Sequence, residues 1–126
     1  MTHRVIQTPQ APHPIGCYSQ AIQAGNLVFL SGQVALEPQT GALVVETFEA
    51  EIHQVFENLK AVAEAAGASL EKVTKFTIYL TDLNLFPQVN EYMMKTLSQP
   101  FPARVTIGVS ALPKGARIEV DAILVL

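Results

Sequence analysis

FEAEIHQVFENLKAVAEAA, residues 48–66, is the most strongly periodic segment of this 126-residue chain. Apolar residues recur at helical spacing and the charged residues fall on the other side, which predicts an amphipathic helix. The residues expected to face the core are Phe48, Ile52, Val55, Phe56, Leu59, Val62, Ala63 and Ala66. Gly67 follows, and glycine is favoured just beyond a helix end. Such a helix needs another layer of structure to cover its apolar side.

The flanking segments supply that layer. Alternating or continuously apolar runs predict strands, and a second amphipathic run predicts another helix at about 85–97. The expected strands are 3–7, 18–24, 27–33, 73–80, 102–109 and 118–126. Gly25 and Asn26 suit a tight turn between the second and third strands, and residues 27–30 are apolar enough to predict burial on both faces. Asp82 or Asn84 is expected to cap the second helix.

The last two strands predict a partner. In 118–126, Glu119 and Asp121 share a face with Ile123 and Val125, so that face is not simply solvated. Two helices cover only one face of a sheet, and a symmetric copy is the simplest cover for the other. We therefore expect a single α+β domain over 1–126. Its mixed sheet of five to six strands carries two helices on one face and subunit contacts on the other.

Composition narrows the function classes. Hydrophobic residues make up 49% of the chain and charged residues only 15%, which also favours an oligomer. The net charge of -3 and the scattered basic residues argue against binding to nucleic acid or an anionic membrane. No stretch approaches the ~20 apolar residues of a membrane span. Residues 1–14 lack the apolar core of a secretory signal, and Cys17 is the single cysteine, so we expect a cytoplasmic protein.

Arg104 and Glu119 are the strongest candidates for chemistry. A permanently charged arginine inside an apolar strand needs an acidic partner or an anionic ligand. Glu119, expected on the same face, could form a structural ion pair with it at a subunit interface. The alternative is a carboxylate-binding site in which Arg104 grips the ligand and Glu119 handles a proton or a water. The three histidines lack metal-ligand spacing, so no metal is expected.

Several blocks resemble the RidA/YjgF family in order and spacing, from about residue 16 to the end. They are Gly16-Cys17-Tyr18-Ser19-Gln20-Ala21, Leu30-Ser31-Gly32-Gln33, Asn58-Leu59 to Ala65-Ala66-Gly67, YLTDLNLFPQVN at 79–90, Pro102-Ala103-Arg104, Leu112-Pro113-Lys114 and Ile118-Glu119-Val120. The resemblance implies a chorismate-mutase-like fold, a homotrimer, and sites in the clefts between subunits. It also implies cofactor-free hydrolysis of reactive 2-imino and 2-enamino acids, such as 2-aminoacrylate and 2-iminobutanoate, to 2-keto acids and ammonia.

The resemblance also implies roles for single residues. Arg104 would bind the substrate carboxylate and Glu119 would polarise the attacking water. The pocket would be lined by Tyr18, Ser31, Gly32, Phe86, Asn90 and Thr106. Three positions depart from the family pattern: Cys17 stands where proline is frequent, Thr106 where cysteine is common, and Val120 where isoleucine or methionine is usual. Thr106 either preserves the mechanism through its backbone carbonyl or marks an altered substrate preference.

Two other functions compete with the deaminase. The first is a non-catalytic protein that binds or senses a small carboxylate, such as a 2-keto acid, through Arg104. The second is an endoribonuclease or translation inhibitor, a label that some members of the family carry. The acidic chain, without a basic stripe or a histidine pair suited to cleaving a phosphodiester, supports this last alternative poorly.

Overall fold

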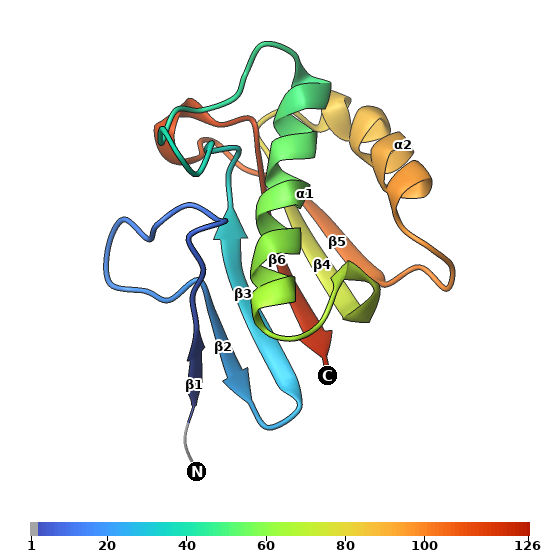
Figure 1. Cartoon of the computed structure of the whole chain (residues 1–126). Helices are drawn as coiled ribbons and strands as arrows, with labels where there is room; N and C mark the ends of the chain where they lie inside the picture. Colours follow the sequence, from blue (N-terminus) through green and yellow to red (C-terminus); the bar gives the residue numbers. More distant parts are fainter. Residues whose placement is uncertain (1–2) are drawn as a thin grey trace.

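The periodic segment folds as α1 (Phe48–Ala65) and packs across a six-stranded sheet in the computed structural model, which describes residues 3–126 (Figure 1). Thr47 caps the helix, since its Oγ1 accepts a 3.0 Å hydrogen bond from the backbone N–H of Ala50. The second helix is α2 (Phe86–Thr96). Asp82 caps the 3-10 turn Leu83–Leu85 that leads into α2, and α2 itself has no side-chain cap.

The predicted strands are present with small shifts at their ends. They are β1 (Arg4–Ile6), β2 (Ala21–Ala24), β3 (Leu27–Gln33), β4 (Val73–Leu80), β5 (Ala103–Gly108) and β6 (Ile118–Val125). The largest shift is at β2, which begins at Ala21 rather than residue 18. The residues before it belong to a loop that the buried Gln20 side chain holds by bonds to backbone groups. Gly25, with a φ of 64°, makes the turn between β2 and β3, a conformation that glycine adopts without strain.

The sheet order is β1-β2-β3-β6-β4-β5. Neighbouring strands are antiparallel except β4 and β5, which are parallel and are connected through α2. The sheet is therefore mixed, as predicted, and β6 lies at its centre between β3 and β4.

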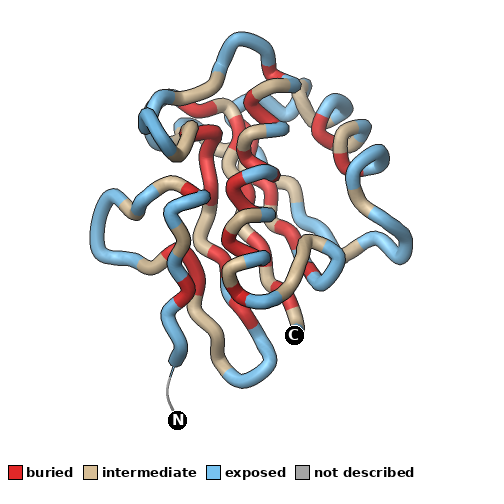
Figure 2. Tube along the Cα trace, viewed as in Figure 1, coloured by how far each residue is buried: buried red, intermediate tan, exposed pale blue. Residues whose placement is uncertain are grey.

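One face of the sheet holds the core. The buried residues of Figure 2 lie along the inner side of α1 and on the strands beneath it. Phe56 of α1 meets Phe76 of β4 with ring centroids 5.6 Å apart. Two polar residues of α1, Glu51 and Asn58, are also fully buried, which an amphipathic pattern does not predict. Glu51 accepts hydrogen bonds from the backbone N–H and from Nε of Arg117, at 2.8 and 2.7 Å, and so ties α1 to the start of β6.

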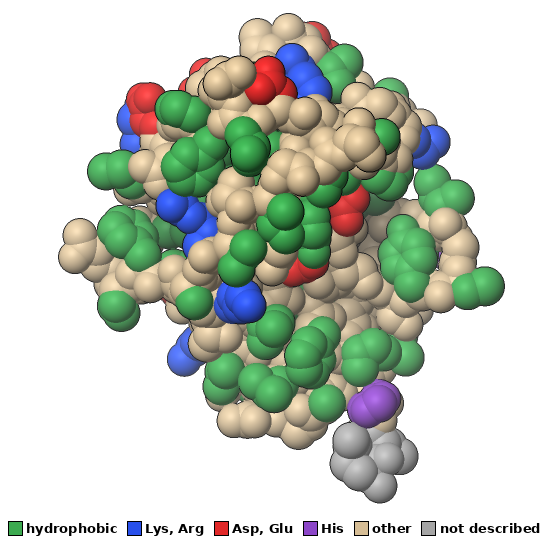
Figure 3. Space-filling view, turned by 180° about the vertical axis from the view of Figure 1, so that it is seen from behind, with side chains coloured by type: hydrophobic (Ala, Val, Ile, Leu, Met, Phe, Trp, Pro, Cys, Tyr) green, Lys and Arg blue, Asp and Glu red, His purple; other side chains and the backbone are tan. Residues whose placement is uncertain are grey.

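The opposite face, which we call the open face, carries no helix. Leu27 and Phe29 of β3 are 37% and 44% exposed there, while Val28 and Leu30 are buried on the helix side. Burial of residues 27–30 on both faces is thus wrong for the single chain. Val105 and Ile107 of β5 are also exposed on the open face. Figure 3 shows this side of the molecule, with hydrophobic side chains spread over it and acidic ones among them.

Candidate functional site

Arg104 and Glu119 lie on opposite faces of the sheet. In the parallel pair β4–β5, Arg104 is aligned with the buried Phe76, so its side chain is on the face that carries the helices. In the antiparallel pair β4–β6, Glu119 is aligned with Tyr79, whose side chain is on the open face. The expectation that the two charged residues share a face is therefore wrong. They form no ion pair within one chain, and each belongs to a separate half-site.

The first group, which we call the rim half-site, consists of Phe86, Asn90 and Met93 of α2 with Arg104 of β5. Nη1 of Arg104 donates to Oδ1 of Asn90 at 2.8 Å and contacts Sδ of Met93 at 3.9 Å. The guanidinium lies 4.8 Å from the centre of the Phe86 ring, within range of a cation–π interaction. A hollow of about 400 Å³ adjoins it, lined by Asn90, Met93, Met94, Leu97, Phe101, Pro102 and Arg104.

These contacts orient the arginine without neutralising it. Asn90 is uncharged, and no carboxylate pairs with Arg104 among residues 3–126. The Nε and Nη2 edge has no hydrogen-bond acceptor in that part of the chain. A fork of this kind matches a carboxylate in a bidentate pair. The rim half-site can therefore bind a small carboxylate from its exposed side.

Thr106 lies two residues beyond Arg104 on the same face of β5. Its Oγ1 is buried and is the one such side-chain atom in residues 3–126 without a hydrogen-bond partner. It does not line the hollow beside Arg104. Of the residues predicted for the pocket, Phe86 and Asn90 contact Arg104. Thr106 lies two residues further along β5 and outside this hollow.

The second group, the open-face half-site, consists of Tyr18, Ser31, Gly32 and Glu119. These residues line a hollow of about 480 Å³ together with Ile15, Val34, Leu36, Pro113 and Lys114. Gly32 makes room for the carboxylate, since a Cβ at this position would overlap Oε2 of Glu119. The pairing of β3 with β6 is also irregular between Leu30 and Gln33, at the residues that approach Glu119. Ser31 and Gly32 thus stay within β3, and the irregular pairing accommodates the Glu119 side chain.

The environment of Glu119 favours proton uptake. Its half-buried side chain loses solvation, which raises the pKa of the carboxyl above its ordinary value, and the neighbouring Asp121 charge raises it further. The Tyr79 hydroxyl donates a 2.9 Å hydrogen bond to Oδ2 of Asp121. That hydrogen bond, followed by burial and the charges of Asp121 and Glu119, raises the pKa of Tyr79 as well.

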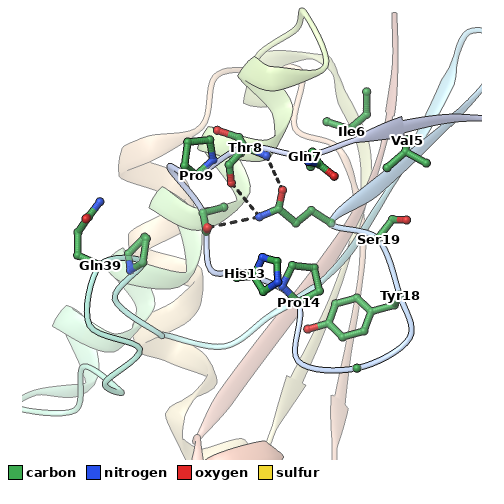
Figure 4. A pocket seen from close by; sticks show the side chains of 14 residues that line it. Val5, Ile6, Gln7, Thr8, Pro9, His13, Pro14, Tyr18, Ser19 and Gln39 are labelled. Carbon is green, nitrogen blue, oxygen red and sulfur yellow. Dashed lines mark hydrogen bonds between the residues drawn. The ribbon is translucent and has the colours of Figure 1, made fainter.

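Tyr18 reaches the half-site from the loop between β1 and β2. Oε1 of Gln20 accepts from the Thr8 N–H at 2.7 Å, and Nε2 donates to the carbonyls of Thr8 and Ala11 at 3.0 and 3.3 Å (Figure 4). The Ser31 hydroxyl donates to the carbonyl of Ser19 at 2.5 Å, so Ser31 fastens this loop to β3. A third hollow of about 680 Å³ lies on the other side of the loop, and its lining includes no carboxylate or guanidinium. Tyr18 borders both hollows, but the charged groups lie in only one of them.

Other sequence candidates lie apart from both half-sites. Cys17 is exposed, and His53 contacts the Tyr92 hydroxyl through Nδ1 at 3.0 Å. Within residues 3–126, no three His, Cys, Asp or Glu side chains are grouped closely enough to hold a metal ion. The same part of the chain contains no helix that is long and apolar enough to cross a membrane.

Sequence reasoning missed Lys114 and Tyr79 as contributors to the surroundings of Glu119. Lys114 lines the hollow, and the pair of Tyr79 and Asp121 stands beside Glu119. The alternation of β6 does place Asp121 on the same face as Glu119, so the sequence indicates that these two carboxylates are neighbours. The position of Tyr79 depends on the register between β4 and β6, which pairs residues 40 positions apart in the chain (Tyr79 with Glu119) and leaves no local signal.

Comparisons with known proteins cover both half-sites. The family model described as endoribonuclease L-PSP matches residues 8–126. A 2-iminobutanoate/2-iminopropanoate deaminase from Dermatophagoides farinae is 47% identical over 98% of this chain and 96% of its own length. The chloroplastic Reactive Intermediate Deaminase A of Arabidopsis thaliana is 47% identical over 97% of this chain and 65% of its own length. The crystal structure of RidA from Psychrobacter sp. PAMC 21119 gives a TM-score of 0.94 at 49% identity, covering 98% of this chain and 99% of that one.

Proposed function

This chain belongs to the endoribonuclease L-PSP family, the RidA/YjgF proteins, and from that premise we propose that it hydrolyses reactive 2-imino and 2-enamino acids to 2-keto acids and ammonia. The proposed substrates are small, with one carboxylate and one C=N bond, as in 2-iminobutanoate. We place the reaction in the cytoplasm, and the chain's own residues perform it without a cofactor.

The observation that carries the proposal is the separation of the two half-sites. Arg104 stands at the rim, on β5 at the edge of the sheet, whereas Glu119 lies in a hollow of the open face. A second copy that brings its rim against the open face would join one half-site of each kind. Such a contact uses different surfaces on the two copies, and it forms a closed ring where the rotation between neighbouring copies closes on itself. A homotrimer with three shared sites meets this need and also covers Phe29, Val105 and Ile107.

Arg104 acts as the carboxylate anchor in this scheme. Asn90 and Phe86 hold the guanidinium while its Nε and Nη2 edge remains for the substrate. A bidentate pair fixes both the distance and the plane of the carboxylate. The adjoining imine carbon is then held at a constant position relative to the neighbouring copy's hollow, which is the main requirement for a reaction of an already electrophilic carbon.

Glu119 acts on the water. Its carboxylate takes a proton as the water oxygen bonds to the iminium carbon, and the C=N double bond becomes a single bond. Glu119 then returns a proton to the nitrogen, the C–N bond breaks to release ammonia, and the ammonia takes the remaining hydroxyl proton as the ketone forms. The sum is iminium plus water to keto acid plus ammonium. A carboxyl whose pKa is raised serves both transfers better than an ordinary glutamate.

The remaining pocket residues shape the cleft. Gly32 leaves room for the Glu119 carboxylate, and Ser31 holds the loop that carries Tyr18. Tyr18 would then close one side of the cleft over the substrate. Thr106 lies behind Arg104, so we assign it an effect on pocket polarity rather than a step in the reaction.

The alternative is a protein that binds a 2-keto acid through Arg104 without turnover. The oriented guanidinium favours binding of any small carboxylate, product included, so this alternative shares half of the site. A ribonuclease function is not favoured, because the chain carries a net charge of -3 and His53, the histidine on α1, is bonded to Tyr92 far from Glu119.

The deciding experiment generates 2-iminobutanoate with a threonine dehydratase and traps it with semicarbazide. We expect the wild-type protein to suppress trapping and to speed release of 2-ketobutyrate. Arg104→Ala should lose this effect by on the order of 100-fold or more, because the substrate carboxylate loses its charged, bidentate partner. Arg4→Ala is the matched control, since Arg4 is an exposed arginine on β1 bonded to Gln23.

Three results are informative. Loss of the effect in Arg104→Ala with retention in Arg4→Ala supports the deaminase and its anchor. No effect of the wild-type protein, together with calorimetric binding of 2-ketobutyrate, supports the binding protein instead. Dissociation of the oligomer in Arg104→Ala, measured by light scattering, would mean that Arg104 is a structural interface residue.

A further inference from the structure

A second carboxylate stands beside Glu119 on the open face. Asp121 lies two residues further along β6, and side chains at that spacing project from the same side of a strand. Across the strand pair, Tyr79 is aligned with Glu119, and its hydroxyl donates to Oδ2 of Asp121 at 2.9 Å. Glu119 lines the hollow, whereas Asp121 and Tyr79 are not part of its lining. The three side chains form one cluster, and Glu119 is its member that lines the hollow.

The two carboxylates differ in their hydrogen bonds. Asp121 has a hydrogen-bond donor in Tyr79, whose hydroxyl fixes the position of the Asp121 carboxylate. Glu119 accepts no hydrogen bond from any group in residues 3–126, although it is the more hemmed in, with Gly32 pressed against its carboxylate. The geometry thus leaves the Glu119 carboxylate free to take a proton from water, whereas the Asp121 carboxylate is tied to Tyr79.

We propose that Asp121, held in place by Tyr79, is a positioning residue for the reaction, whose charge makes Glu119 hold the proton taken from water until the nitrogen needs it. This inference rests on the proposed function, because it assigns a role within imine hydrolysis. It extends that function to two residues that touch neither substrate nor water.

Other charged groups face Glu119 and act against Asp121. Lys114 and Tyr18 line the same hollow, from the loop before β6 and from the loop before β2. In the proposed trimer, Arg104 of the neighbouring copy and the bound substrate also approach. Ser31 and Gly32 on β3 and Ile107 on β5 carry no charge. In that trimer, Arg104 of the neighbouring copy would favour an ionised Glu119 that gives up its proton readily. Asp121 offsets this effect, and this is the physical need for a second carboxylate.

The test measures the proton affinity of Glu119 directly and apart from turnover. The side-chain carboxyl carbon of Glu119 is assigned by its disappearance in Glu119→Gln and is titrated by ¹³C NMR on the intact oligomer. Asp121→Asn removes the charge and can still accept from Tyr79. Asp121→Glu keeps the charge, and Tyr79→Phe removes the donor but leaves the charge. Glu64→Gln, on the exposed side of α1, is the control for loss of one negative charge.

We expect the titration midpoint of Glu119 to fall in Asp121→Asn and to stay raised in Asp121→Glu. In Tyr79→Phe it should fall by a smaller amount, because Asp121 keeps its charge but loses the bond that holds it in place. The acidic limb of the pH profile of kcat/KM should shift to lower pH together with the midpoint. Asp121→Asn should therefore retain a severalfold larger share of its plateau activity at acidic pH. A purely structural pair predicts instead that Asp121→Asn and Tyr79→Phe weaken the oligomer together and leave the midpoint in place. Should Asp121→Asn not assemble, Tyr79→Phe decides, because an unchanged midpoint after loss of the bond that holds Asp121 contradicts the proposal.

Two results would overturn the inference. One is an unchanged midpoint in Asp121→Asn, or an equal change in Glu64→Gln. The other is a lowered midpoint with an unmoved acidic limb, which would separate Asp121 from the reaction. Because the titration needs no substrate, a protein without imine deaminase activity still reports whether Asp121 governs Glu119. Failure of the proposed function and failure of this inference are therefore distinguishable.

Discussion

The rim and the open face each present one charged residue, and the surroundings act on the two residues in different ways. At the rim, Arg104 is exposed and its neighbours Asn90 and Phe86 are uncharged. On the open face, Glu119 is half-buried, pressed against Gly32, and shares its surroundings with Asp121. The rim fixes the direction of the Arg104 side chain. The open face raises the proton affinity of the Glu119 carboxyl.

The difference follows from the two functional groups. A guanidinium stays protonated wherever a protein places it, so Arg104 needs orientation but not seclusion. A carboxyl group holds or releases its proton according to burial and to nearby charge, so Glu119 depends on its environment. A binding group can therefore sit on an exposed edge, whereas the proton-transfer group needs a prepared recess. The two half-sites can therefore be inactivated separately, one by loss of the carboxylate anchor and the other by loss of the proton-transfer group.

The largest expected effect comes from mixing two inactive variants. Arg104→Ala lacks the anchor, and Glu119→Gln should lose about 10²- to 10⁴-fold in kcat/KM because amide cannot take up the proton. When the two are unfolded and refolded together, every mixed trimer contains one junction with Arg104 on one side and Glu119 on the other. Random assembly at equal amounts should therefore restore about a quarter of the wild-type activity.

The same mixture tests whether the site is shared at all. A site built within one chain predicts no recovery, since each chain lacks an essential group. Two preparations mixed without unfolding serve as the control, and their activity should stay low if the subunits do not exchange. Recovery of keto-acid release in the trapping assay, followed against the refolded wild type, is the measurement.

An intermediate effect separates two glycines that stand one in each region. Gly32→Ala puts a Cβ into the Glu119 carboxylate and should lower kcat/KM by about 10- to 100-fold while the chain still folds. Gly108→Ala, on β5, meets Leu83 side-chain atoms at 3.2 Å, and Leu83 is exposed and able to move. It should change kcat/KM by no more than about twofold. Equal losses in the two variants would contradict the cradle assigned to Gly32.

The smallest effect concerns stability and has a defined sign. The folded-state pKa of Glu119 is raised, so its protonated form stabilises the fold at pH values below the ordinary Glu pKa of 4.5. That contribution is lost as the pH rises through the folded-state value. Near neutral pH, Glu119→Gln should thus have a higher melting temperature than the wild type. Its free energy of unfolding should be larger by less than about 1 kcal/mol, because the group is half-buried. In acid the two proteins should be equally stable. Thermal unfolding of both proteins at matched concentration is the measurement, and a lower melting temperature of Glu119→Gln near neutral pH would contradict the burial effect.

The sequence was sufficient for the elements and for the turn at Gly25. The helical period of 48–66 and the alternation of 118–126 are local signals, and both correspond closely to observed elements. Local signals do not contain the order of the strands, because the position of β6 between β3 and β4 depends on contacts between distant residues. The resemblance named the residues of the candidate site, and the fold separates them into two groups.

The error on Arg104 has a specific physical cause. Alternation divides β5 into two faces but does not say which face meets the helices. The apolar residues Val105 and Ile107 would usually be assigned to the core, yet they are exposed on the open face, where a partner can cover them. Arg104 occupies the helix side because β5 is an edge strand and α2 leaves its rim accessible. Sequence alone cannot distinguish a surface buried by its own chain from one that is buried by another copy.

The central place of β6 affects when the protein can fold during its synthesis. β6 is synthesised after every other strand, yet β3 and β4 both pair with it and not with each other. While the ribosome is still making residues 1–117, the growing chain can form α1 and the β2–β3 hairpin but has no continuous sheet for them to rest on. Folding must wait until residues 118–125 emerge and are inserted between strands made earlier, a step dominated by long-range contacts and therefore slow. Until then the edges of β3 and β4 that pair with β6 stay unpaired, and a nascent chain shorter than residue 118 is expected to expose them.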